Sequence, residues 1–118
     1  MTKRQTSKST RAQVLILREI VEDETPDASY LEQEGFEKRR GEYNRGDFSF
    51  VGVRAVAEIH MPMDRKRAVF ITSRIRSPGV WGIESDSGED YFNQVFEDET
   101  EILMTMLNSL RNYKLIKE

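Results

Sequence analysis

The 118-residue sequence contains no cysteine, only three prolines, one tryptophan and one histidine. The absence of cysteine excludes thiol catalysis, disulfides, zinc–thiolate sites and iron–sulfur clusters, and it fits a reducing compartment. No run of the sequence approaches the roughly 20 apolar residues that a membrane span requires, and no apolar stretch near its start resembles a secretory signal. We therefore expect a cytoplasmic protein with no membrane association, whose core needs neither disulfides nor structural metal.

The motifs of several enzyme classes are also missing. The sequence has no G-x-x-x-x-G-K or G-x-G-x-x-G stretch for phosphate binding, no serine in a G-x-S-x-G setting, and no second histidine beside His60. It therefore predicts no cofactor, no metal and no catalytic residue, and we do not expect an enzyme.

Charge is present in both signs but is divided into blocks. Residues 1–18 carry five basic side chains and no acid, and residues 19–34 carry seven acids and no base. Residues 59–76 carry five bases and one acid, and residues 77–110 carry eight acids and no base. Such blocks create local potentials that the net charge of -3 hides, and they could select partners by sign.

The sequence predicts a flexible basic arm over residues 1–10 and a single α+β domain over residues 11–118. Residues 12–22 are rich in β-branched side chains and alternate in two apolar sets, which favours a strand. A helix is the alternative, since Val14, Leu17 and Val21 also have helical spacing. Two strands alone are marginal in water, so the hairpin that follows needs a third strand and favours the first interpretation.

Residues 48–60 give the clearest strand, because Val53, Ala55 and Ala57 belong to an apolar parity that should face the core. We expect a hairpin loop over residues 61–66 and a partner strand over residues 67–75.

The remaining segments complete the expected architecture. Residues 28–45 suggest two short helical pieces broken at Gly35, which pack on a sheet edge or on Phe48 and Phe50. Residues 80–87 are expected to form a loop, and residues 88–113 an amphipathic helix that covers the Ala55 and Ala57 face. The predicted fold is a three-stranded antiparallel sheet covered by a long C-terminal helix, with a short helical segment between the first two strands.

One carboxylate interrupts the apolar stripe of that last helix. Glu99 projects between apolar neighbours, where an unpaired charge is costly, so it should find a cation or hydrogen-bond donors. Arg54 is the expected partner in a buried ion pair, and Arg18 and His60 are alternatives.

A resemblance suggests a biological setting. The stretches DFSFVGVRAVAEI (47–59) and ITSRIRSPGVWGIESDSGEDY (71–91), with a P-D-x-S-Y-L turn over residues 26–31, resemble a group of short uncharacterised bacterial, plasmid and phage proteins. This chain differs from their pattern by Arg74-Ile75-Arg76 after the I-T-S stretch. The resemblance implies a mobile genetic element in a bacterial host and does not imply a reaction.

We therefore expect an accessory or interaction protein that binds a host or element protein, with nucleic-acid mimicry or inhibition as a sharper version. Its contact surface should combine an aromatic anchor with acids of the last third of the chain: Trp81, Glu84, Asp86, Glu89, Asp90, Glu97, Asp98 and Glu101.

Two other functions stay open. A small metal-assisted hydrolase would use Asp86, Glu89 and Glu99. A nucleic-acid binder would use the basic arm and the hairpin cations, although the overall acidity argues against a nucleic-acid partner; these cations are Arg65, Lys66, Arg67, Arg74 and Arg76. The oligomeric state is not predicted.

Overall fold

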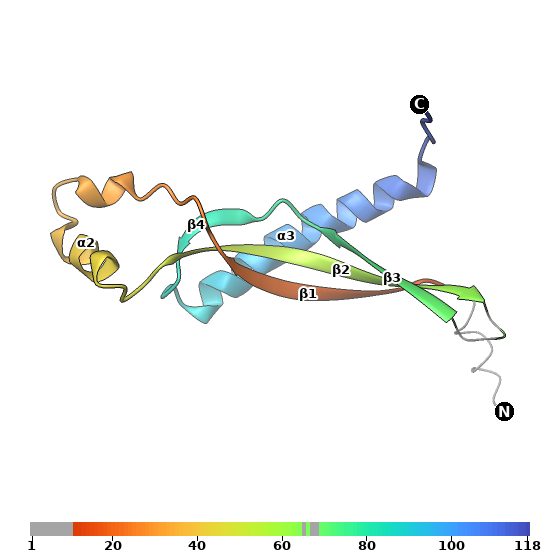
Figure 1. Ribbon diagram of the computed structural model, residues 1–118, viewed down its shortest axis with the longest axis horizontal. Coiled ribbons are helices and arrows are strands. Elements are labelled where there is room, and N and C mark those ends of the chain that lie inside the picture. Colours follow the sequence, from red (N-terminus) through yellow and green to blue (C-terminus); the bar gives the residue numbers. More distant parts are fainter. Residues whose placement is uncertain (1–10, 65, 67–68) are drawn as a thin grey trace.

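The computed structural model describes residues 11–64, 66 and 69–118. One antiparallel sheet of four strands forms the centre of an elongated molecule, and a long C-terminal helix packs on it (Figure 1). The predicted α+β class is confirmed. The basic arm expected over residues 1–10 lies outside the described residues.

Strand β1 (Gln13–Glu22) confirms the strand interpretation of this segment. It pairs with strand β2 (Phe50–Asp64) in a register that runs without a break from Gln13 opposite His60 to Glu22 opposite Val51. Its two alternating sets of side chains therefore face opposite sides of the sheet. The helical spacing in this segment has no structural role.

Strand β2 is longer than expected and includes most of the predicted hairpin loop. It continues to Asp64 because it pairs with strand β3 (Val69–Arg76), and the predicted loop over residues 61–66 is therefore too long. The register shifts between Pro62 and Asp64. A proline has no N–H for the ladder and is tolerated at such irregularities.

The expected loop over residues 80–87 is wrong, because Val80–Glu84 form a fourth strand, β4. β3 and β4 pair with different stretches of the same edge of β2. Serine side chains extend the pairing at both ends of β4: the Ala55 N–H donates to Ser77 Oγ at 2.9 Å, and the Ser49 N–H donates to Ser85 Oγ at 2.8 Å. These hydroxyl oxygens take the place of ladder carbonyls, so β2 stays paired across the breaks.

Helix α3 (Glu89–Ser109) ends in a short 3₁₀ turn, η3 (Leu110–Asn112), and covers one face of the sheet as expected. Leu103 packs against Ala55 and Ala57, whose small side chains allow the helix to approach β2 closely. Nearer its start, Phe92 and Val95 pack with Val53 and Ile83.

The segment between β1 and β2 forms the two predicted helical pieces, η2 (Ser29–Glu32) and α2 (Glu37–Asn44). Gly35 separates them with a φ of +97°, a conformation that favours glycine. Leu31 is buried against Phe48 and Phe50, which confirms one of the two expected packing positions.

The opposite side of the sheet carries no helix over its middle (Figure 1). Because neighbouring residues of a strand point to opposite faces, Gly52, Arg54, Val56 and Glu58 of β2 belong to this side. We call it the open face. Within the described residues, no helix combines the length and apolar character that crossing a bilayer demands.

Candidate functional site

The single tryptophan, Trp81, lies on the open face and is 43% exposed. Its ring covers the backbone of Gly52, where an added Cβ would come within 2.2 Å of the ring atom Cε3. Its Nε1–H donates a hydrogen bond of 3.0 Å to the carbonyl oxygen of Pro78. The contact and the hydrogen bond fix the ring, so a partner that binds it has little side-chain entropy to remove.

A β-bulge directs Trp81 onto this face. Trp81 and Gly82 of β4 lie opposite the single residue Gly52, because the register shifts between Val51 and Val53. Gly79 and Gly82 have φ values of +88° and +75°, which glycine adopts without strain. Gly79 just before the strand and Gly82 within its bulge therefore shape the backbone that orients the tryptophan.

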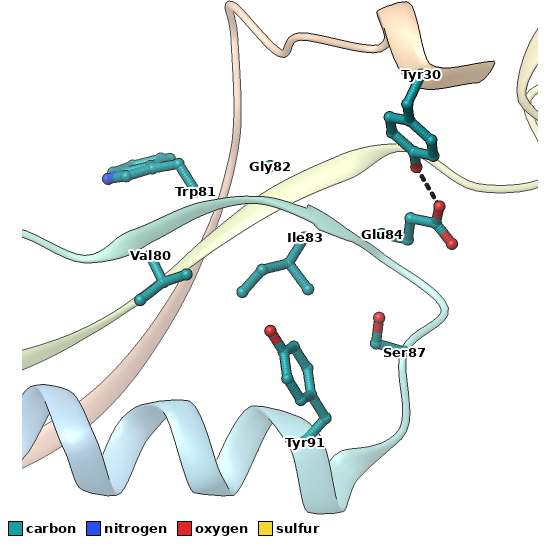
Figure 2. Close-up of a pocket in the computed structure, with 8 residues that line it drawn as sticks. All are labelled: Tyr30, Val80, Trp81, Gly82, Ile83, Glu84, Ser87 and Tyr91. Carbon is teal, nitrogen blue, oxygen red and sulfur yellow. Dashed lines mark hydrogen bonds between the residues drawn. The ribbon is translucent and has the colours of Figure 1, made fainter. Parts of the chain in front are cut away.

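Trp81 borders two surface pockets. The first, of about 420 Å³, lies beside β4, with Tyr30 and Trp81 on one side of the strand and Tyr91 on the other (Figure 2). The second, of about 400 Å³, lies between Trp81 and the turn Glu22–Thr25 that follows β1. The exposed indole of Trp81 thus lines both pockets.

Acidic residues of this turn line the second pocket together with Trp81. Glu22 and Glu24 are exposed, and neither takes part in an ion pair with another described residue. Asp23 fixes the turn, since its N–H donates to the Phe50 carbonyl at 2.9 Å and its Oδ1 accepts from the Thr25 N–H at 3.1 Å. A fixed turn therefore contributes to this pocket two exposed acids that have no ion pair with another described residue.

A cation of the chain itself already lies near this ring. The guanidinium carbon of Arg54 is 5.8 Å from the centroid of the Trp81 ring, within the range of a cation–π contact. Its Nε–H donates to the carboxylate of Glu19, which lies directly opposite it on β1. The ring thus already accepts a guanidinium as a neighbour.

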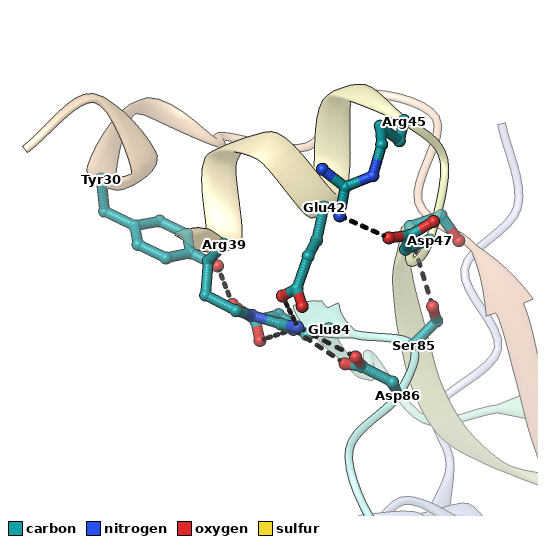
Figure 3. A network of polar contacts seen from close by, with 9 residues as sticks. Tyr30, Arg39, Glu42, Arg45, Asp47, Glu84, Ser85 and Asp86 are labelled. Carbon is teal, nitrogen blue, oxygen red and sulfur yellow. Dashed lines mark hydrogen bonds and ion pairs between the residues drawn. The ribbon is translucent and has the colours of Figure 1, made fainter. Parts of the chain in front are cut away.

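A polar network joins α2 to β4 and positions Tyr30 at the first pocket (Figure 3). Arg39 forms ion pairs of 2.6 Å with Glu84, 2.7 Å with Glu42 and 2.9 Å with Asp86. The guanidinium of Arg39 also lies 3.9 Å from the centroid of the Phe48 ring.

The same network shifts two pKa values. Hydrogen bonding from Arg39 lowers the pKa of the Asp86 carboxyl below its usual range. Burial, together with a hydrogen bond that its hydroxyl donates to Glu84, raises the pKa of Tyr30 to about 12. Tyr30 is therefore neutral at physiological pH and remains a donor to Glu84.

Three of the predicted contact acids form ion pairs within the chain. Glu84 and Asp86 bind Arg39, and Glu89 binds Arg18 at 2.9 Å across the gap between helix and sheet. They stabilise the packing of α2, β4 and α3. Their charges are largely compensated and are poorly suited to attracting a partner.

The other predicted acids are exposed on α3: Asp90, Glu97, Asp98 and Glu101. Since α3 and Trp81 lie on opposite sides of the sheet, the outward side of α3 and the indole do not form one surface. The predicted contact residues therefore fall into two groups on different sides of the molecule, Trp81 on the open face and Glu97, Asp98 and Glu101 on α3. Glu84 lines the first pocket with Trp81, and the second pocket is lined by Glu22, Asp23 and Glu24, which the sequence offered only as part of the acidic block 19–34.

The expected ion pair between Glu99 and Arg54 is also wrong. Glu99 is buried, with 3% exposure, and its Oε1 accepts a hydrogen bond of 2.6 Å from the Gly79 N–H. Arg54 points to the open face and binds Glu19, whereas α3 lies on the other face. The backbone donor satisfies the buried carboxylate and ties α3 to the turn that precedes Trp81.

The acids of the alternative hydrolase are not gathered in the described part of the chain. Asp86, Glu89 and Glu99 have three different partners, and no group of three or more possible metal ligands occurs in the described part of the chain. Of the hairpin cations, Arg74 binds Glu58 at 2.7 Å and Arg76 lies 3.5 Å from Glu19. Arg65 and Arg67 lie outside the described residues.

Comparison with family models, curated proteins and solved structures finds no match for this chain.

Proposed function

We propose that the chain is a non-enzymatic interaction protein that binds a basic, extended segment of a partner protein at Trp81. One observation carries this proposal: a fixed, 43% exposed indole borders two pockets, and one of them is also lined by Glu22 and Glu24, which form no ion pair with another described residue. Exposed aromatic anchors in preformed pockets are the residues that contribute most to protein interfaces.

The chemistry of the second pocket selects a cation. A lysine or arginine side chain placed there would lie against the indole and receive charge-assisted hydrogen bonds from Glu22 or Glu24. A phosphate would meet these carboxylates with the same sign of charge. The site therefore favours a basic protein segment over a nucleic acid.

The first pocket suggests how the segment lies. Within the described residues β2 is the only strand that pairs with β4, and aromatic rings flank the pocket beside β4 from both sides. An extended peptide can add its backbone to a strand edge and place alternate side chains in the flanking pockets. In this arrangement Tyr30 and Tyr91 contact its apolar side chains.

The mobile genetic element and the host or element protein as partner belong to this proposal and depend on the resemblance to plasmid and phage proteins. Nucleic-acid mimicry has less support, because Glu84, Asp86 and Glu89 are held by arginines.

A selection from random peptides displayed on phage tests the proposal, with counter-selection against a Trp81→Ala variant. We expect peptides with at least one lysine or arginine, whose affinity falls about tenfold or more for Trp81→Ala, as for an interface hot spot. Because Trp81 is the only tryptophan, its fluorescence reports their binding directly. Their affinity should also weaken as salt is added.

A charge-matched pair of double variants locates the binding site. Glu22→Gln with Glu24→Gln should weaken the selected peptides, whereas Glu97→Gln with Glu101→Gln on the outward side of α3 should leave their affinity unchanged. Peptides that bind Trp81→Ala as well as the wild type, or that respond only to the α3 pair, would contradict the proposal.

A further inference from the structure

β1 is a ten-residue strand, and one of its edges is paired with no described strand. β2 is the only strand that pairs with it among the described residues, and none of its ten residues is buried. Val14, Leu15, Leu17 and Ile20 are between 38% and 51% exposed and occupy both faces of the strand. A long, regular and apolar strand edge is a template for pairing with another strand.

β1 lacks two of the usual protections of an edge strand, a proline and a bulge. Its central charges are directed inward: Arg18 binds Glu89 and Asn93 of α3, and Glu19 binds Arg54 of β2. Each of these charges has a partner within the chain, so it opposes an approaching strand only where a like charge lies directly opposite.

We propose that two copies of this chain associate by antiparallel pairing of their β1 strands, which joins the two sheets into one. Antiparallel pairing of two identical strands has two-fold symmetry, so each copy uses the same edge. The assembly therefore stops at two copies, and neither β1 edge remains available. This association goes beyond the proposed function at Trp81 and does not depend on it.

The charges of β1 select the register. In an antiparallel pair, the residue numbers of any two directly opposite residues add up to the same sum, which defines the register. Directly opposite residues share a face of the sheet, so in a pair of identical strands this sum must be even. A sum of 36 would place Arg18 opposite its copy, and a sum of 38 would place Glu19 opposite its copy, both with repulsion of like charges. A sum of 34 avoids both, pairs all residues from Gln13 to Val21 and places Leu17 at the two-fold axis.

This register predicts a specific cross-link. In Leu17→Cys the two thiols would lie on directly opposite residues, whose Cα atoms are about 4.5–5.5 Å apart, a separation that a disulfide spans. In the control Leu15→Cys, which has the same face and similar exposure, the two thiols would be about 14 Å apart along the strands. The natural chain has no cysteine, so each variant carries a single thiol.

Two measurements test the proposal. Under mild oxidation Leu17→Cys should become a disulfide-linked dimer while Leu15→Cys stays mostly monomeric, and equal cross-linking at both positions would overturn the register. By light scattering coupled to gel filtration, the full chain should have twice its mass of 13.8 kDa. Leu17→Lys should return it to 13.8 kDa, and Ile71→Lys, at a similarly exposed position on β3, should not. A wild-type chain that is monomeric at every concentration, or a dimer that only Ile71→Lys dissociates, would overturn the proposal.

Discussion

Replacing Gly52 with alanine tests whether Trp81 is held against the sheet. An added Cβ would lie 2.2 Å from Cε3 and 2.6 Å from Cδ2 and Cζ3 of the indole. Carbon atoms pack at about 3.5 Å or more, so the ring must move by at least about 1.3 Å. The φ of Gly52 is outside the left-handed region, so alanine introduces no strain of that kind and the steric effect is isolated.

The expected cost follows from these distances. Overpacking of this kind costs about 1–3 kcal/mol, and the reduced entropy of the unfolded chain returns about 0.4–1 kcal/mol. A net loss of about 1–2 kcal/mol lowers the melting temperature of a domain of this size by about 4–8 °C. The displaced indole should also become more accessible to solvent.

Thermal unfolding followed by circular dichroism, and quenching of Trp81 fluorescence by acrylamide, measure the two effects. Gly41→Ala is the control, because its new Cβ would lie 3.4 Å from Arg45 Nη1, in ordinary contact, and alanine favours the helix that contains it. We expect Gly41→Ala to melt slightly higher than the wild type and to leave quenching unchanged. Gly52→Ala with wild-type melting and quenching would refute the close packing of Trp81 on β2.

Three further predictions concern the contacts around this site. Glu99→Leu leaves the Gly79 N–H without its acceptor and should lower the free energy of unfolding by about 1–3 kcal/mol in urea titrations. Glu99→Gln keeps an acceptor and should lower this free energy less. Equal losses in the two variants would contradict this hydrogen bond. Ser77→Ala removes the acceptor of the Ala55 N–H and should also lower the free energy of unfolding by about 1–3 kcal/mol. The control Ser73→Ala, at an exposed position, should leave this free energy almost unchanged. Similar losses in both variants would contradict the role of the Ser77 hydroxyl. Tyr30 has a folded-state pKa of about 12, above its ordinary value of 10.0, so its contribution to stability is complete below pH 10 and is lost as the pH rises towards 12. Urea unfolding on either side of pH 10 should show a smaller loss for Tyr30→Phe than for the wild type, and identical pH dependence would contradict this assignment.

The local sequence pattern was sufficient to predict the elements that bury one face and expose the other. The parity of Val53, Ala55 and Ala57 predicted the face that α3 covers, and the breaks at glycine predicted the two helical pieces before β2. In both cases the information lies within a few consecutive residues, because burial on one side imposes a period on the sequence.

β4 could not be predicted in this way, since its formation depends on a partner strand about 30 residues earlier. Residues 80–87 have no regular alternation of their own, and only the pairing with β2 makes Val80–Glu84 a bulged strand. The orientation of Trp81 follows from that bulge, which shifts the register by one residue and has no local signal.

The partner of Glu99 was missed for a different reason. The parity that placed Ala55 under α3 also places Arg54 on the other face, so the sequence already contained the argument against an ion pair between Arg54 and Glu99. The actual donor, the Gly79 N–H, is a backbone group, and side-chain patterns give no indication of where such donors lie.

Hydrogen–deuterium exchange with and without a saturating peptide from the display selection tests the central claim most directly. If Trp81 anchors a basic extended segment, exchange should slow at the turn 22–25 and at 79–82, while residues 97–101 on α3 should exchange as in the free chain. Slower exchange at 97–101 with no change around Trp81 would place the binding surface on the helix and contradict the account.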